Sequence, residues 1–525
     1  MAKVLITDKI NDLAVRIVSN VAQVDNLPTM DEDKLCEIIG EYDALLVRSQ
    51  TKVTKKIIEA AKNLKIIGRA GVGVDNIDVE AATKQGIIVV NSPDGNTHAA
   101  AEHTIAMMMA MSRNIPSADL SVKQGLWERS KFTGVEVYSK TLGIIGLGKI
   151  GTIVLNVAHA LGMKVVVYDP YAKAEIVEKT GAKYIQNLDD FWGLCDYITI
   201  HTPKTKETAN LINEDTLKKT KKGVRIINCA RGGIIDEAAL AKAIEEGQVA
   251  QCAIDVYEDE KHVDKSPLIK LGSKAILTPH LGASTDEAQI NVALDVANQV
   301  VEVLSGRNAT SAINIPALKP QKLEAVKEFM ELAENIAKIA SQLSKGAIKD
   351  IKINVSGKLA TLDISPLEIA ILKGVLSANM VGINYVNAPV MAQARGIEVK
   401  ISKSTSKDDS IEVEIVSSDS HTIVKGALIA KDVKRIVQLN NYITSIEPQN
   451  NMLLVPHINK PNMVAQVASV IGADNINISG MQVAQNIEKS EKSIMIINVD
   501  SVVEESTLNK ISKIEGVDRA AYISL

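Results

Sequence analysis

The sequence predicts an α/β protein with two doubly wound parallel-sheet domains, an α+β domain after them, and a C-terminal domain with the element order βαββαβ. A chain of 525 residues is too long for one hydrophobic core. Near the N-terminus, short β-branched runs such as VLIT, ALLV and IIVVN alternate with helical patterns, which is typical of a parallel sheet covered by helices. The C-terminal order is that of a ferredoxin-like sandwich.

The individual elements follow from the hydrophobic pattern and its breaks. Helices are predicted near residues 11–19, 54–61 and 79–85, between the first strands. The segment SPDGNTHAAAEHTIAMMMAMSR begins with turn and cap residues and continues as a long apolar helix. A second α/β unit runs from Thr141 to about Pro279, and the segment EAQINVALDVANQVVEVLSG is another long helix.

Two prolines, Pro316 and Pro320, break the pattern after this helix and mark a linker. Beyond it lie a charged helix and strands such as IKINVSG and IEVEIV. The last part of the chain holds the βαββαβ pattern, from LLVPHI to AAYISL. We therefore predict four domains, formed by residues 1–96 with 286–315, by 97–285, by 316–449 and by 450–525.

Composition and charge exclude several classes of protein. The net charge of -4 provides no basic field for nucleic acid or for an anionic membrane. The N-terminal MAKVLITDK is no secretory signal, and no apolar run approaches the length of a spanning helix. The four cysteines are scattered without CxxC spacing, which predicts reduced thiols and neither disulfides nor a metal site. We expect a cytoplasmic protein with a small-molecule substrate.

The segment TLGIIGLGKIG carries the strongest motif. Gly146, Gly148 and Gly151 have GxGxxG spacing, after an apolar strand and before a helix whose N-terminus can bind a phosphate. Asp169 closes the next strand, 18 residues after Gly151, where a carboxylate binds the adenosine ribose and repels a 2′-phosphate. The pattern therefore predicts NAD as the cofactor, and Lys149 and Ile150 belong to the same loop. A plain glycine-rich turn with a solvated aspartate is the alternative.

The histidine in TPHLGAST indicates the type of reaction, which is hydride transfer from a hydroxy acid. Hydride transfer from a hydroxy acid needs a base for the hydroxyl proton, a carboxylate that holds the base, and a cation for the substrate. His280 suits the first task, and Arg231 and the acids of AIDVYEDE also follow apolar strands. Ligands bind at that edge of a doubly wound sheet. The alternative for His280 is a purely structural role. We expect His98 to lie near the N-cap of the long helix and His103 to be packed on that helix.

The stretches RAGVGVDNID, GNTHAAAEH, GIIGLGKIG, HTPKT, NCARGGIIDE, AIDVYEDE and PHLGAST resemble the D-isomer-specific 2-hydroxyacid dehydrogenases. They span residues 68–285 in the order of that family. The resemblance implies that Arg231 binds and polarises the substrate and that His280 is the acid/base. It implies Glu260 as the partner of His280, with Glu258 as the alternative, because the segment before His280 is slightly longer than usual. It also implies a cofactor surface that includes Thr202, Cys229, Ala230, Arg231, Asp255, His280, Gly282 and Ala283.

The same resemblance implies how the substrate is bound. The backbone N–H groups of Val72 and Gly73 would bind the substrate carboxylate, with Asn96 nearby. Arg48 and Ser49 end one strand and Arg69 the next, and an arginine fork suits phosphate oxygens. A surface salt bridge is the alternative for each arginine.

The chain continues about 200 residues beyond the general family fold. This length argues against a minimal glycerate or lactate dehydrogenase. With the arginines expected for a phosphate, the resemblance implies NAD-dependent oxidation of 3-phospho-D-glycerate to 3-phosphohydroxypyruvate, the entry step of serine synthesis. Another 2-hydroxyacid dehydrogenase, such as a glyoxylate or hydroxypyruvate reductase, is the first alternative. A remote one is an NAD-sensing protein like the corepressors of this family.

The C-terminal domain resembles an ACT regulatory domain. His457 and Asn459 on the first strand-to-helix loop, with Asn477 on the next strand, resemble a serine-binding triad. The sequence departs from the pattern at Asn462, where glycine is usual, so a purely structural role in dimerisation stays open. Residues 316–449 resemble an allosteric substrate-binding domain, and the resemblance implies a homodimer or a homotetramer.

Overall fold

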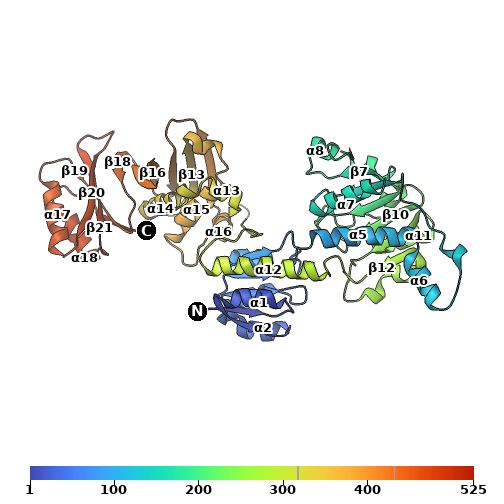
Figure 1. Ribbon diagram of the computed structural model, residues 1–525. Coiled ribbons are helices and arrows are strands. Elements are labelled where there is room, and N and C mark those ends of the chain that lie inside the picture. The colour runs from blue at the N-terminus through green and yellow to red at the C-terminus, as the bar shows by residue number, and fades with distance from the viewer. Residues whose placement is uncertain (316–317, 431) are drawn as a thin grey trace.

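The computed structural model describes residues 1–315, 318–430 and 432–525, so the predicted linker residue Pro316 lies outside the described residues. Four sheets follow one another along the chain (Figure 1). Two are parallel, with five and seven strands, the third is a mixed sheet of six strands, and the fourth is an antiparallel sheet of four. The predicted fold class is confirmed, while the domain boundaries stay a prediction.

The first sheet has the strand order β2-β1-β3-β4-β5. Its helices begin where the sequence supplies caps, because the side chains of Asn11, Asp31 and Asp78 each accept a backbone hydrogen bond from the first turn. The strands are β1 (Ala2–Ile6), β2 (Ala22–Asn26), β3 (Ala44–Val47), β4 (Ile66–Arg69) and β5 (Ile88–Asn91). The helices are α1 (Asp12–Ser19), α2 (Glu32–Ile38), α3 (Lys55–Ala60) and α4 (Val79–Lys84).

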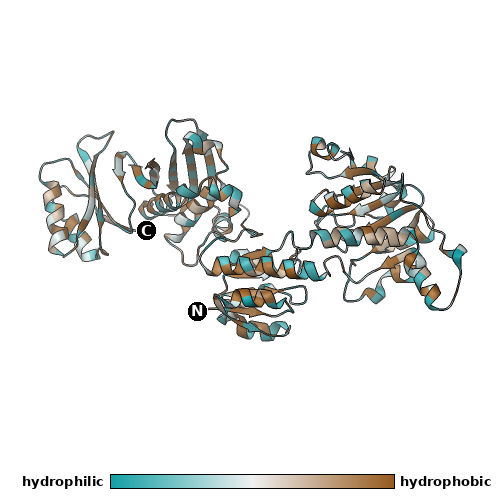
Figure 2. Ribbon diagram, viewed as in Figure 1, coloured by the Kyte–Doolittle hydropathy of each residue, from teal (hydrophilic) through white to brown (hydrophobic). Residues whose placement is uncertain are grey.

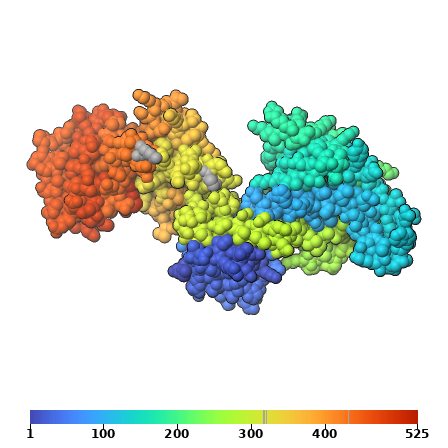
Figure 3. Space-filling view, viewed as in Figure 1, coloured from blue at the N-terminus to red at the C-terminus, as the bar shows by residue number. Residues whose placement is uncertain are grey.

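A helix from much later in the chain, α12 (Asp286–Leu304), covers this first sheet and packs against α1 and β4. Figure 3 shows it as a lime band along the N-terminal lobe. Its buried face, with Val292, Val296 and Val300, belongs to the core of the first sheet. Gly68 permits the close approach, since a Cβ there would lie 2.5 Å from Val296 Cγ1. The chain therefore crosses between the first two sheets twice.

The second sheet is parallel, with the order β12-β11-β10-β9-β6-β7-β8, and hydrophobic clusters fill both of its faces. The order reverses between β9 and β6, and ligands bind at such a switch point. The strands are β6 (Thr141–Ile145), β7 (Lys164–Tyr168), β8 (Lys183–Tyr184), β9 (Tyr197–Ile200), β10 (Val224–Asn228), β11 (Val249–Ile254) and β12 (Ala275–Leu277). The helices are α5 (Thr97–Ser112), α6 (Ile115–Lys123), α7 (Lys149–Ala160), α8 (Ala174–Glu178), α9 (Leu188–Trp192), α10 (Glu214–Lys219) and α11 (Glu237–Glu245).

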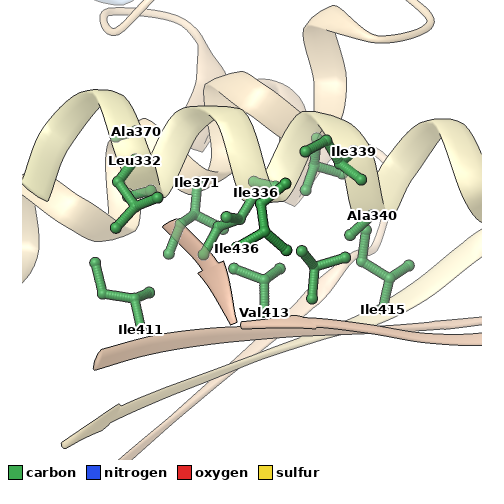
Figure 4. Packing of buried hydrophobic residues seen from close by; sticks show 14 of the residues in the cluster. Leu332, Ile336, Ile339, Ala340, Ala370, Ile371, Ile411, Val413, Ile415 and Ile436 are labelled. Atoms are coloured by element: carbon green, nitrogen blue, oxygen red, sulfur yellow. The ribbon is translucent and has the colours of Figure 1, made fainter. Parts of the chain in front are cut away.

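The third sheet has two long helices packed on one face. Figure 4 shows Leu332 and Ile336 of α14 lying over Ile411, Val413 and Ile415 of β15. The helices are α13 (Pro320–Glu324), α14 (Lys327–Leu343), α15 (Ser365–Ser377) and α16 (Ala388–Ala394). The strands are β13 (Ile348–Ser356), β14 (Glu398–Ser404), β15 (Ser410–Ser417), β16 (His421–Ala430), β17 (Val433–Leu439) and β18 (Tyr442–Ile446).

The fourth sheet has the order β20-β21-β19-β22, and its elements confirm the predicted βαββαβ sequence. One face packs on its two helices, while residues of the other face, such as Leu454 and Ile496, belong to the core of the third sheet. The strands are β19 (Asn451–Ile458), β20 (Ile478–Gln485), β21 (Lys492–Val499) and β22 (Ala521–Ser524), and the helices are α17 (Met463–Ala473) and α18 (Glu505–Ser512).

Hydrophobic residues are concentrated inside these layers rather than on the helix surfaces. In Figure 2 the strands of the second sheet are largely brown, whereas α12 alternates between brown and teal along its length. In the described part of the chain, no helix has both the length and the apolar character that crossing a membrane would require.

Candidate active site

The turn between β6 and α7 has the geometry of a phosphate cradle. Gly146 has a φ of 92°, and a Cβ there would lie 2.7 Å from Thr202 Cγ2. A Cβ on Gly151 would lie 2.3 Å from the carbonyl oxygen of Gly146. A Cβ on Gly148, the N-cap of α7, would meet nothing within 4 Å, so open space lies beside the helix N-terminus. This open cradle fits the pyrophosphate of a dinucleotide.

Asp169, at the end of β7, holds the same turn in place. Its two carboxylate oxygens accept hydrogen bonds of 2.8 Å from the backbone N–H groups of Leu147 and Tyr171. A carboxylate has about four lone-pair sites, so Asp169 can still accept hydrogen bonds from a ribose diol. The hydroxyl of Thr202 is buried and has no partner among the described residues, as expected of a group that a cofactor satisfies.

The other predicted residues of this loop have protein partners. Ile150 packs against the core between the sheet and α5. The Lys149 ammonium forms an ion pair with Asp94, which lies just before α5. Lys149 therefore ties the glycine turn to the chain segment that joins the first two sheets.

His280 and Glu260 form a hydrogen-bonded pair. His280 Nδ1 lies 2.8 Å from Glu260 Oε1, and both side chains are about half exposed, at 47% and 45%. The carboxylate fixes Nδ1–H as the donor, which leaves Nε2 as the atom that can accept a proton. The alternative partner lies elsewhere, because Glu258 Oε1 accepts from the backbone N–H of Glu237. Of the two predicted acids, the structure brings only Glu260 to His280.

Asp255 organises the turn that carries His280. Its carboxylate accepts hydrogen bonds from the Thr278 hydroxyl and from the Leu281 and Gly282 N–H groups, at 2.6, 2.8 and 2.9 Å. Its carbonyl accepts from the His280 N–H, at 2.9 Å. These bonds hold His280 at a φ of 56°, a left-handed conformation that a non-glycine residue rarely adopts.

The carboxylate of Asp255 is fully buried and stays ionised. Burial by itself would raise its pKa, but hydrogen bonds from His103, Thr278 and Leu281 outweigh burial and hold the pKa below its usual value. His103 Nε2 lies 3.2 Å from Asp255 Oδ1. His103, expected to be a helix-packed residue, is 18% exposed, and its Nε2 also lies 3.3 Å from the Thr278 hydroxyl.

The 229–231 segment follows β10 and lies beside the His280 turn. A Cβ on Gly282 would lie 3.8 Å from the Cys229 carbonyl, so the two loops are neighbours. Burial raises the pKa of the Cys229 thiol to about 12, which makes it a neutral group and not a nucleophile. Ala230 and Ala283 are half-buried members of these two loops.

Arg231 reaches across to the first sheet. Its Nε lies 3.2 Å from Asp75 Oδ2, and its guanidinium is so near Gly73 that a Cβ there would lie 2.2 Å from Nη2. The arginine therefore connects the loop after β10 with the segment that follows β4 of the first sheet. Asp75 was not identified from the sequence, because nothing in RAGVGVDNID indicates a partner 156 residues away.

Arg69 and Arg48, at the ends of two strands of the first sheet, add positive charge near Arg231. Burial, with smaller effects from Arg231 and Arg48, lowers the pKa of Arg69 to about 10. Its Nε is buried and has no hydrogen-bond partner in the described chain. Arg48 donates a long hydrogen bond of 3.3 Å to the Lys9 carbonyl, which restrains its guanidinium group only weakly. Three arginines that lie near one another, with Asp75 bonded to Arg231, form a site suited to an anionic ligand.

The remaining substrate-binding candidates follow β3, β4 and β5 of the first sheet. Among the described residues, the N–H groups of Val72 and Gly73 donate no hydrogen bond, so they are available to a carboxylate. Asn96, the N-cap of α5, has a buried side-chain oxygen without a partner in the described chain. Ser49 is exposed beside Arg48.

A pocket of ≈ 340 Å³ adjoins the His280–Glu260 pair. Both residues line it, and most of its other lining is apolar, including Val263, Ile269 and Leu277. The acid/base pair therefore has a largely apolar surface on one side.

The structure does not bring the three predicted effector residues together. His457 and Asn459 lie at the end of β19, next to the start of β21, whereas Asn477 precedes β20 at the opposite end of the sheet, next to the end of β21. His457 is buried, with Nδ1 3.1 Å from the Val455 carbonyl, while Asn459 donates to the Ser490 carbonyl. The Asn477 N–H donates to Asp500 Oδ1. Asn462, where glycine was expected, has a φ of 70°, a conformation that asparagine tolerates better than most residues.

The comparisons with known proteins agree with this geometry. The family model "D-isomer specific 2-hydroxyacid dehydrogenase, NAD binding domain" matches residues 105–282, and "D-3-phosphoglycerate dehydrogenase intervening domain" matches residues 325–440. A solved D-lactate dehydrogenase from Aquifex aeolicus, complexed with NAD and lactic acid, is 28% identical with a TM-score of 0.52. It covers 58% of this chain and 96% of its own. The class of protein that the fold and the site define is therefore an NAD-dependent 2-hydroxyacid dehydrogenase.

Relatives that match over the full length of the chain show which family of this class it belongs to. The D-3-phosphoglycerate dehydrogenase of Synechocystis is 46% identical over 100% of this chain and 95% of its own length. That of Methanocaldococcus jannaschii is 40% identical over 100% of both chains. The chain belongs to the D-3-phosphoglycerate dehydrogenase family.

Proposed function

We propose that this protein oxidises 3-phospho-D-glycerate to 3-phosphohydroxypyruvate with NAD, the first step of L-serine synthesis. The observation that carries the proposal is the meeting of two features at one sheet edge. His280, which is paired with Glu260, follows β12. Arg231 follows β10, contacts Asp75, and lies near Arg48 and Arg69 of the first sheet. The full-length relatives support the same activity.

Each group has a task in this reaction. Bound NAD supplies the acceptor for the hydride from C2 of the substrate. His280 Nε2 takes the hydroxyl proton, and Glu260 stabilises the imidazolium that results. Arg231 binds the substrate beside C2 and stabilises the charge that develops on the oxygen. The N–H groups of Val72 and Gly73 bind the carboxylate, and Arg48 and Arg69 bind the phosphate.

The substrate is tested by comparing two acids. NADH production from 3-phospho-D-glycerate should greatly exceed that from D-glycerate, in alkaline buffer with a ketone trap. In Arg48→Ala, KM for the phosphorylated acid should rise by about 10–100-fold, because a hydrogen bond to a charged group contributes about 1.5–3 kcal/mol. The rate with D-glycerate should not change.

Arg16→Ala is the matched control, since Arg16 is an exposed arginine of the same lobe and should leave both rates unchanged. Equal rates with the two acids would instead indicate a general hydroxyacid reductase. Background turnover with NAD still bound would indicate an NAD-sensing protein.

We also propose that serine binds the C-terminal domain and inhibits. With Nδ1–H donating to Val455, His457 Nε2 can accept from an amine or hydroxyl. Serine at millimolar concentration should lower the rate, and Asn459→Ala should raise the half-inhibitory concentration by about tenfold, the loss of about one hydrogen bond. Asn509→Ala, at an exposed asparagine on α18 of the same domain, is the control. A rate insensitive to serine would leave the domain with a structural role.

The location and assembly of the chain are part of the same proposal. All four cysteines are free, which supports a reducing, cytoplasmic setting. The arm around α6 exposes large apolar side chains, including Leu120 at 56% and Trp127 at 80%. Patches of this kind mark protein–protein contacts, so they support a homodimer through this arm, which the tail domains could extend to a tetramer.

A further inference from the structure

Glu237 is a buried acid that the proposed chemistry does not use. It is the first residue of α11, directly after the N-cap Asp236, and it is 7% exposed. Buried carboxylates in proteins are held by hydrogen bonds or charges, because an unpartnered one is strongly disfavoured. The partners of Glu237 therefore show which part of the molecule it stabilises.

Both partners belong to the loop that carries Glu260. Glu237 Oε1 accepts a hydrogen bond of 2.7 Å from the Glu258 N–H, and Oε2 accepts one from the Ser266 hydroxyl. Glu258 Oε1 in turn accepts from the Glu237 N–H at 3.3 Å. A single carboxylate thus fastens the two ends of the segment 258–266.

Glu260 lies between these two ends and points away from the core. Its side chain is 45% exposed, and its carboxylate is bonded to His280. Inside the loop, Asp259 pairs with His262 at 2.8 Å, an exposed contact that adds little rigidity. The position of Glu260 relative to His280 therefore depends on where the ends of the loop are held.

We propose that Glu237 is a positioning residue for the acid/base pair, which it serves by holding the 258–266 loop so that Glu260 meets His280. The inference rests on the proposed function, because it requires that Glu260 supports His280 in the reaction. Glu237 touches neither of those side chains, so it acts only through the loop.

The test is a double-mutant cycle of Glu237→Ala and Glu260→Ala, with kcat and KM measured for 3-phospho-D-glycerate oxidation. Glu237→Ala should lower kcat by about 10–100-fold, since a displacement of about 1 Å can have that effect, and KM for NAD should change little. In the Glu260→Ala background it should lower kcat no further.

Two further variants keep the test decisive. Glu237→Gln retains an acceptor for the Glu258 N–H and should recover most of kcat, while Glu245→Ala, an exposed acid of the same helix, should behave as wild type. If Glu237→Ala does not fold, Ser266→Ala removes one attachment only and should show a smaller loss with the same non-additivity.

The outcomes separate the two proposals. Wild-type activity in Glu237→Ala, or an equal loss in both backgrounds, would overturn the positioning role while leaving Glu260 in place. Wild-type activity in Glu260→Ala would instead overturn the proposed acid/base pair itself.

Discussion

His280→Asn is expected to lower kcat for hydroxy-acid oxidation by about 10²–10⁴-fold, the usual contribution of a general base. Asparagine is the informative replacement because His280 has a φ of 56°, and asparagine tolerates that conformation better than alanine does. The hydrogen bonds from the turn to Asp255 should therefore survive, and only the imidazole is lost. Steady-state NADH formation measures the effect.

NAD affinity and a second histidine provide the controls for this variant. The affinity, followed by fluorescence titration, should change by less than about threefold, because the phosphate cradle lies on other strands. His262→Asn removes an exposed histidine of the neighbouring loop, paired with Asp259, and should retain wild-type kcat. A His280→Asn enzyme with more than a tenth of wild-type kcat would exclude His280 as the base.

Arg231→Lys is expected to lower kcat/KM by about 10²–10³-fold, comparable to the loss of one donor that stabilises a developing oxyanion. A lysine keeps the charge but presents a point ammonium in place of the planar fork. It also lacks the Nε through which Arg231 contacts Asp75. The loss should therefore appear in both kcat and KM.

Arg113→Lys, an exposed arginine at the end of α5, is the matched control and should leave kcat/KM unchanged. Asp75→Asn should have a much smaller effect than Arg231→Lys, because it removes only the internal partner of the guanidinium. If Arg231→Lys had the wild-type KM for the substrate, the proposed role of Arg231 in binding the substrate would be contradicted.

Much of the fold could be predicted because its signals are local. The glycine spacing in β6–α7 is set by contacts within a few residues of the turn, apart from the neighbouring Thr202, and the caps Asn11, Asp31 and Asp78 act within one helical turn. The alternation of β-branched runs and amphipathic helices predicted both parallel sheets. The βαββαβ tail was predicted for the same reason, and its observed strands lie within about two residues of the expected ones.

The residue types of the site could be predicted from the sequence, but the contacts between those residues could not. The sequence indicated a histidine, an arginine and a cluster of acids at strand ends, yet it left Glu258 and Glu260 as alternatives. It missed Asp75, and it did not indicate the contact between His103 and Asp255. Each of these depends on which strands are neighbours and on the path of a loop, and neither is encoded in a short stretch of residues.

The sequence by itself determined the elements, the phosphate cradle and the residue types that the reaction needs, because these depend on short-range sterics and on hydrophobic periodicity. Only the tertiary structure decided which acid pairs with His280 and which acid meets Arg231. It alone showed that Glu237 fastens the loop between β11 and β12. The physical reason is that hydrogen bonds between side chains act over about 3 Å, and the packing of whole sheets and helices determines which side chains come that close.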